Sequence, residues 1–235
     1  DVYKRQQPLN VFVVALIAML VCAAFGTVTG FFIAYLNVPP FIATLAMMEI
    51  VYGIGLIVTN ATPLGGYVEQ YTNVSNGKFL GINYLIWIAI IVAAITWFIF
   101  NMTRHGKYMY AIGGNPQAAE VAGVPVKATL ILIYMKAAAM YGLAGFMLGA
   151  KAGGASVQTG YGYEMEAIAA CTIGGVSVTG GRGKVSSAII GVAVFELLKV
   201  ALQYLGMNAN AQYIAIGVVI FIAISLDIRK YIARK

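Results

Sequence analysis

Four ionisable residues lie inside long apolar runs, where a charge is costly and therefore marks a candidate for function. These residues are Glu49, Lys136, Glu196 and Lys199. Glu196 and Lys199 are three positions apart, so on a helix they share a face and can neutralise each other. Glu49 and Lys136 can pair only across helices. Structural ion pairing and a proton relay both remain open, although the apolar runs contain no histidine.

The sequence offers no complete set of residues for catalysis or for binding a nucleotide or a metal. GGRGKVSS approaches a phosphate-binding loop, but that motif needs glycine where Val178 stands and a hydroxyl residue where Val185 stands. Ser156 and Ser177 have no histidine in the apolar runs to activate them. The single histidine, His105, has no companion ligand. We therefore expect no catalytic residue and no metal site, and we expect any ATP hydrolysis to occur on another polypeptide.

The composition identifies an integral membrane protein. Hydrophobic residues make up 61% of the 235 positions and charged residues 10%, whereas about a quarter of the residues in soluble domains are charged. Long unbroken apolar runs argue against a β-barrel, whose strands alternate polar and apolar residues. The expected fold class is all-α, a polytopic transmembrane helix bundle of about seven spans. The predicted spans are Leu9–Tyr35, Phe41–Thr59, Tyr84–Phe100, Ala128–Ala150, Met165–Val178, Val185–Leu205 and Gln212–Ile228.

The fifth predicted span, 165–178, is short for a full crossing. It either crosses the membrane or forms a re-entrant or broken helix that surrounding protein shields. Glycines spaced four apart predict close helix packing, at Gly26 and Gly30 and again in the series Gly145, Gly149 and Gly153. A face of small residues also suits helices that slide during alternating access.

The basic residues indicate the orientation of the chain. With the polar segment 103–127 in the cytoplasm, alternation of the spans places nine basic residues inside: Arg104, Lys107, Lys127, Arg182, Lys184, Arg229, Lys230, Arg234 and Lys235. The outer loops hold only Lys78 and Lys151, if the first six residues are set aside as non-native. This asymmetry follows the positive-inside rule and predicts a cytoplasmic C-terminus. It also explains the net charge of +7 without nucleic acid as a partner.

The cytoplasmic segment 103–127 contains the signals of a short helix. Residues 113–115 form a predicted turn, Pro116 suits a first helical position, residues 117–121 continue the helix and Gly123 can end it. A short helix that bears small residues between two spans can dock into a groove on a partner.

At this segment the sequence resembles a known family. YAIGGNPQAAEVAGV closely resembles the coupling loop of the sugar-importing ABC permeases of the ribose and galactose group. The blocks IAYLNVPPFIATLAMMEIVYG, YEMEAIAACTIGGVSVTGGRGKV and NANAQYIAIGVVIFIAISLDIRKY are similar to other parts of that family, in the same order. The resemblance runs from about Gly30 to the C-terminus and favours the galactose or methyl-galactoside branch.

The resemblance implies a homodimeric permease in the bacterial inner membrane that imports a monosaccharide by alternating access. A cytoplasmic ATPase subunit would bind ATP and Mg, a periplasmic sugar-binding protein would dock outside, and this chain would bind no cofactor. The match places Phe41 and Thr44 on the translocation path. It assigns coupling to the ATPase to Gly113, Gly114, Asn115, Pro116, Ala118, Ala119 and Gly123.

The chain also departs from the family pattern. Family members usually have about ten spans, and an earlier G-x-D-L-S-x-G block has no counterpart here. We therefore expect residues 7–235 to form one permease domain without its N-terminal helices, which would not transport alone. Glu49, Lys136 and Glu196 stand where the family leads us to expect uncharged residues.

Two other functions are alternatives to an ABC permease. One is an ATPase-independent secondary transporter or channel, and the other is a membrane scaffold without transport.

Overall fold

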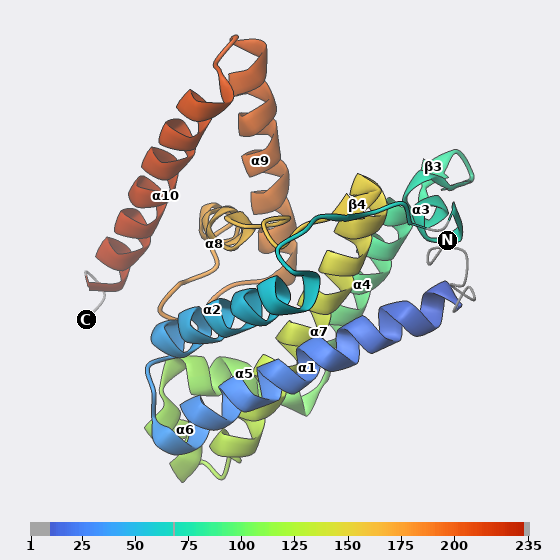
Figure 1. Cartoon of the computed structure of the whole chain (residues 1–235). Coiled ribbons are helices and arrows are strands. Elements are labelled where there is room, and N and C mark those ends of the chain that lie inside the picture. Colours follow the sequence, from blue (N-terminus) through green and yellow to red (C-terminus); the bar gives the residue numbers. More distant parts are fainter. Residues whose placement is uncertain (1–9, 68, 233–235) are drawn as a thin grey trace. The chain divides into compact units, whose positions relative to one another are not determined.

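A computed structural model describes residues 10–67 and 69–232 (Figure 1). The expectation that residues 1–6 are non-native lies outside the described residues. The helices are α1 Val11–Leu36, α2 Pro40–Thr59, α3 Glu69–Asn76, α4 Tyr84–Met102, α5 Arg104–Gly114, α6 Pro116–Val121, α7 Val126–Ala152, α8 Tyr163–Ile173, α9 Val185–Tyr204 and α10 Ala209–Ile232. The strands have two residues each: β1 Leu64–Gly65, β2 Lys78–Phe79, β3 Ile82–Asn83 and β4 Gly154–Ala155. The predicted all-α fold class is confirmed.

Six helices in the described part of the chain are long and apolar enough to cross a membrane: α1, α2, α4, α7, α9 and α10. They correspond to six of the seven predicted spans. The remaining prediction, 165–178, contains α8, which has 11 residues. At 1.5 Å per residue this helix is about 16 Å long, roughly half the thickness of the hydrocarbon core. Gly174 and Gly175 follow it and stop its propagation.

The chain divides into two compact units, which we describe separately. Unit 1 runs to residue 92 and resumes over 125–160, and unit 2 comprises 93–124 and the chain from 161 onward. The first half of α4 therefore belongs to unit 1 and its second half to unit 2.

Unit 1 is built on the packing of α1 against α7. The backbones approach closely because small residues face each other at the contact. A methyl group built on Gly30 would lie 2.8 Å from the Ile131 Cα, and one built on Gly26 would overlap the Tyr134 carbonyl. The predicted packing role of Gly26 and Gly30 is therefore confirmed.

On α7 the contact residues differ from the predicted glycine series. A methyl group on Gly142 would lie 2.6 Å from the Ala18 carbonyl oxygen, so Gly142 is the close-approach position toward α1. A methyl group on Gly149 would lie 2.6 Å from the Tyr71 hydroxyl oxygen, whereas one on Gly145 would meet no described atom within 4 Å. Gly153 caps the end of α7. The series at 145, 149 and 153 therefore does not form one continuous packing face.

The segment that connects α2 to α4 folds onto the end of α7. The Tyr71 hydroxyl of α3 donates a hydrogen bond to the Phe146 carbonyl at 2.6 Å. The hydroxyl of buried Ser75 donates to the Ala150 carbonyl at 3.0 Å. Burial raises the pKa of the Tyr71 phenol, and repulsion from Tyr67 raises it further. The antiparallel pair β1 and β4 adds a second link between this segment and the chain beyond α7.

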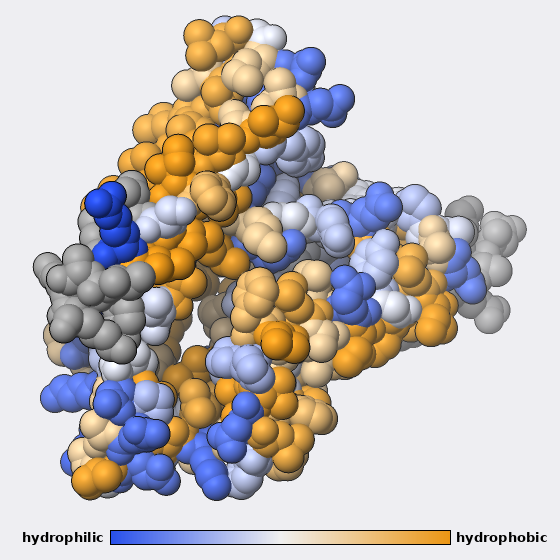
Figure 2. Space-filling model, turned by 90° about the vertical axis from the view of Figure 1, so that its left-hand side faces the viewer, coloured by the Kyte–Doolittle hydropathy of each residue, from blue (hydrophilic) through white to orange (hydrophobic). Residues whose placement is uncertain are grey.

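In unit 2, α8 packs against α9 and α10. A methyl group on Gly191 of α9 would overlap the Ala170 carbonyl of α8, so these two backbones are in direct contact. The buried core consists of Ala169, Ala170, Phe195 and Ile216. Hydrophobic residues dominate the face of α10 that Figure 2 shows. The exposed apolar side chains of this helix include Ile214, Val218 and Phe221. Such a surface is suited to lipid or to another membrane-embedded chain.

Candidate functional site

Two short helices, α5 and α6, form most of the segment 103–127, for which a cytoplasmic location was predicted. Thr103 caps α5 through its side chain, which accepts a hydrogen bond from the Gly106 amide at 3.2 Å. The helix continues through Gly114, where a turn was predicted, and only the extended residue Asn115 separates it from α6. The Asn115 side chain then accepts from the Ala118 amide at 3.0 Å and starts the second helix.

The predicted short helix is present, with Pro116 in its first turn. It ends in a Schellman motif, in which the Gly123 amide donates to the Glu120 carbonyl and the Val124 amide to the Ala119 carbonyl, both at 3.0 Å. Gly123 has a φ of +83°, a conformation that favours glycine. The segment therefore fixes both ends of a six-residue helix by its own capping residues.

The two alanines of α6 have different environments. Ala119 is buried within unit 2, whereas Ala118 is exposed and Val121 is 90% exposed. Ala118 and Val121 therefore leave apolar side chains on the surface of α6. Val121 was not among the predicted coupling residues, although its place in the predicted helix was a usable signal.

The glycine-rich turn at residues 177–183 supports α5. A methyl group on Gly181 would lie 2.7 Å from the Gly114 amide nitrogen, so the two backbones touch. The Tyr110 hydroxyl of α5 donates to the Gly183 carbonyl at 2.8 Å. Gly113 faces Gly181 in the same contact, which gives Gly113 a packing position within unit 2. This contact was not predicted, and the three glycines of GGRG were its only local signal.

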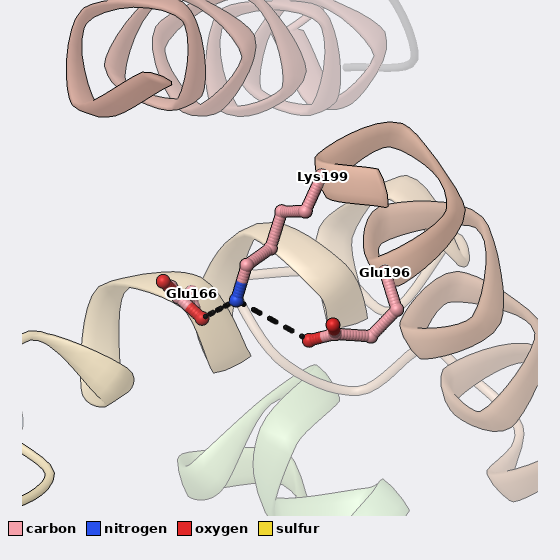
Figure 3. A network of polar contacts seen from close by, with 3 residues as sticks. All are labelled: Glu166, Glu196 and Lys199. Carbon is pink, nitrogen blue, oxygen red and sulfur yellow. Dashed lines mark hydrogen bonds and ion pairs between the residues drawn. The ribbon is translucent and has the colours of Figure 1, made fainter. Parts of the chain in front are cut away.

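Within α9, Lys199 lies between two carboxylates (Figure 3). Its Nζ is 2.8 Å from the Glu166 Oε2 of α8 and 3.5 Å from the Glu196 Oε1 one turn away. The predicted pairing of Glu196 with Lys199 is therefore present. The stronger partner, Glu166, was missed because it is 33 residues away in the sequence. Charged groups in a span are stabilised by such pairing, which here also connects α8 to α9.

We predict that Lys199→Met lowers the free energy of unfolding by about 2 kcal/mol, because it leaves Glu166 shielded from water without its cation. The Glu166 side chain is only 22% exposed, whereas the Glu196 side chain is 58% exposed. Glu196→Gln should therefore cost less than about 1 kcal/mol. Denaturation in bicelles measures both values. Equal losses for the two variants would show that the close contact with Glu166 adds nothing.

The other predicted residues lie in unit 1 and do not gather into a site. Glu49 is exposed on α2, Lys136 is partly buried on α7, and the two form no ion pair with each other. Phe41 and Thr44 are exposed in the first turns of α2, where the Thr44 hydroxyl donates to the Phe41 carbonyl at 3.0 Å. Their roles stay predictions.

These features define a polytopic α-helical membrane protein with a short capped helix, α6, between two of its spanning helices. The chain belongs to the family described as branched-chain amino acid transport system / permease component, which matches residues 2–224. The predicted recognition as a permease is thereby confirmed. No solved structure matches the chain.

Individual relatives are import permeases for sugars. The chain is 40% identical over 232 residues to the galactose/methyl galactoside import permease protein MglC of Escherichia coli K12, a match that covers 94% of this chain and 69% of the relative. It is 35% identical over 225 residues to the ribose import permease protein RbsC of the same strain, covering 94% and 70%. A Treponema pallidum MglC is 39% identical, with 43% of its length covered.

Proposed function

We propose that this chain is the membrane-spanning subunit of an ATP-driven importer that carries a monosaccharide across the bacterial inner membrane by alternating access. The observation that carries the proposal is the 40% identity to a galactose/methyl galactoside import permease over 94% of the chain. The family description mentions branched-chain amino acids. The individual relatives favour a sugar, and galactose, methyl galactoside and ribose are the first candidates.

The proposed partner at the cytoplasmic segment is a separate ATPase subunit, which would bind ATP and Mg. Asn115, Pro116 and Gly123 would shape α6, and Ala118 would enter the partner's groove together with Val121. Gly113, Gly114 and buried Ala119 would hold the helix in place from within unit 2. The capping contacts and the exposure of Val121 support this division of roles.

Two further partners complete the proposed importer. A periplasmic sugar-binding protein would deliver the monosaccharide, and a second copy of the permease would form a homodimer. The exposure of every predicted path residue on α2 is consistent with a path completed by other parts of the assembly. Phe41 and Thr44 remain the proposed path residues, and the chain itself is proposed to bind no cofactor.

Uptake of labelled substrates tests the substrate class. Cells that lack the gene should lose uptake of one of galactose, methyl galactoside or ribose, and the restored gene should return it. Leucine uptake serves as the matched comparison for the family description. Loss of leucine uptake alone would contradict the sugar proposal, and no loss of any substrate would favour a scaffold without transport.

We also propose that the C-terminus is cytoplasmic. Arg104 and Lys107 of α5, Arg182 of the 177–183 turn and Arg229 near the end of α10 belong to elements that touch within unit 2. Their shared positive charge supports one cytoplasmic location under the positive-inside rule. We predict fluorescence from green fluorescent protein fused after Lys235 and no activity from alkaline phosphatase fused at the same point. The reverse pattern would place the C-terminus outside.

A further inference from the structure

The turn formed by residues 177–183 is closed on itself. The Ser177 amide donates to the Arg182 carbonyl at 3.1 Å, and the Gly180 amide donates to the Ser177 carbonyl at 3.3 Å. Gly181 has a φ of +71°, which favours glycine. The turn also continues α8, because the Val176 amide bonds back to the Cys171 carbonyl of that helix at 2.9 Å. The closed turn is therefore joined directly to the end of α8.

One side of this turn carries the last turn of α5. A methyl group on Gly180 would lie 3.0 Å from the Gly113 carbonyl oxygen, which leaves no space for a side chain between the backbones. The Tyr110 hydroxyl adds a hydrogen bond to the Gly183 carbonyl at 2.8 Å. Only Asn115 separates α5 from α6, the helix proposed to meet the ATPase. α6 is therefore connected to this contact through the end of α5.

The other side of the turn is held by a carboxylate of α10. The Asp227 Oδ2 accepts hydrogen bonds from the Ser177 hydroxyl and the Val178 amide, each at 3.1 Å. Asp227 forms no ion pair with Arg229 in the described part of the chain, although the two lie on the same helix turn. Hydrogen bonds to a charged acceptor are stronger than those between neutral groups. The carboxylate thus fixes the turn to α10.

We propose that Asp227 is a positioning residue for energy coupling. It keeps the 177–183 turn attached to α10, so that a displacement of α5 and α6 moves α8 and α10 and is not absorbed within the turn. This inference rests on the proposed function, because it requires an ATPase at α6. Tyr110 has the corresponding role on the α5 side of the same turn.

The test compares sugar uptake per ATP hydrolysed in proteoliposomes that contain the assembled importer. Asp227→Ala should lower this ratio about tenfold, the effect of losing a charged hydrogen bond, while the ATPase subunit stays bound. Asp227→Asn keeps an acceptor oxygen and should recover most of the ratio. Arg229→Ala removes a neighbouring exposed charge and should leave the ratio unchanged.

Tyr110→Phe provides a second variant that removes a single hydroxyl, which keeps the proposal testable if Asp227→Ala does not assemble. Tyr110→Phe should also lower the uptake per ATP hydrolysed. The fold-loss in the double variant should be smaller than the product of the two single fold-losses, because both substitutions loosen the same turn. An unchanged ratio in Asp227→Ala or Tyr110→Phe would overturn the proposal. This includes the case in which uptake and ATP hydrolysis fall equally. Failure of the unaltered chain to bind any ATPase would instead refute the proposed function.

Discussion

Val121→Arg should abolish sugar uptake by the importer, with a loss of about 100-fold, while the permease itself stays folded. Val121 is 90% exposed on α6, so the larger side chain meets no obstacle within the described chain. In the proposed complex the same position lies in a groove of the ATPase subunit. A charge buried there without a partner costs several kcal/mol of binding free energy, enough for a 100-fold loss of affinity.

Val121→Leu is the matched control, because it keeps an apolar side chain at the same position and should retain near-normal uptake. Co-purification of the ATPase subunit with each variant separates a docking defect from a transport defect. Yield and elution volume of the purified permease report folding. Retention of both the ATPase and uptake by Val121→Arg would remove α6 as the docking element and favour an ATPase-independent transporter.

Gly142→Val should destabilise unit 1 strongly, by about 2 to 3 kcal/mol. The first carbon of the new side chain would lie 2.6 Å from the Ala18 carbonyl oxygen, and this oxygen belongs to the backbone of α1 and cannot rotate away. The helices must then separate along their contact. In a membrane the hydrophobic effect does not replace the lost contacts, because close van der Waals packing supplies much of the free energy of helix association.

Gly145→Val is the matched control on the same helix. A methyl group at position 145 would meet no described atom within 4 Å, so the variant should change stability by less than about 0.5 kcal/mol. Both variants make the same chemical change in α7, so the intrinsic helix propensity cancels in the comparison. Unfolding in bicelles with increasing denaturant measures the difference. Equal stabilities for the two variants would contradict the assigned α1 and α7 contact.

Local signals predicted the parts of the fold that depend on neighbouring residues. Apolar length defined the spanning helices, and Pro116 and Gly123 marked the ends of α6 because each acts within one turn of its own position. The sequence also marked 165–178 as short for a full crossing, but it did not show that the helix ends at Ile173, before two glycines that lie inside the predicted span. The family resemblance implied a partner for α6, an ATPase subunit, which the residues alone did not specify.

Features that depend on distant contacts were not predictable in this way. α5 ends in two glycines, which disfavour a helix, and it is stabilised by the Thr103 cap and by the contact of Tyr110 with Gly183. The pairing of Lys199 with Glu166 joins two helices whose rotation is set by packing. For the same reason the spacing of the glycines in α7 did not identify Gly142 as the residue that meets α1.

The central claim is that ATP hydrolysis on a partner subunit drives sugar import through this chain. The most direct measurement is uptake of labelled galactose into proteoliposomes that contain the importer purified through a tag on the permease that includes this chain, with sugar-binding protein outside and ATP inside. We predict uptake that requires ATP and stops when the nucleotide is replaced by a non-hydrolysable analogue. Uptake that continues without ATP would contradict the claim and identify a secondary transporter or channel.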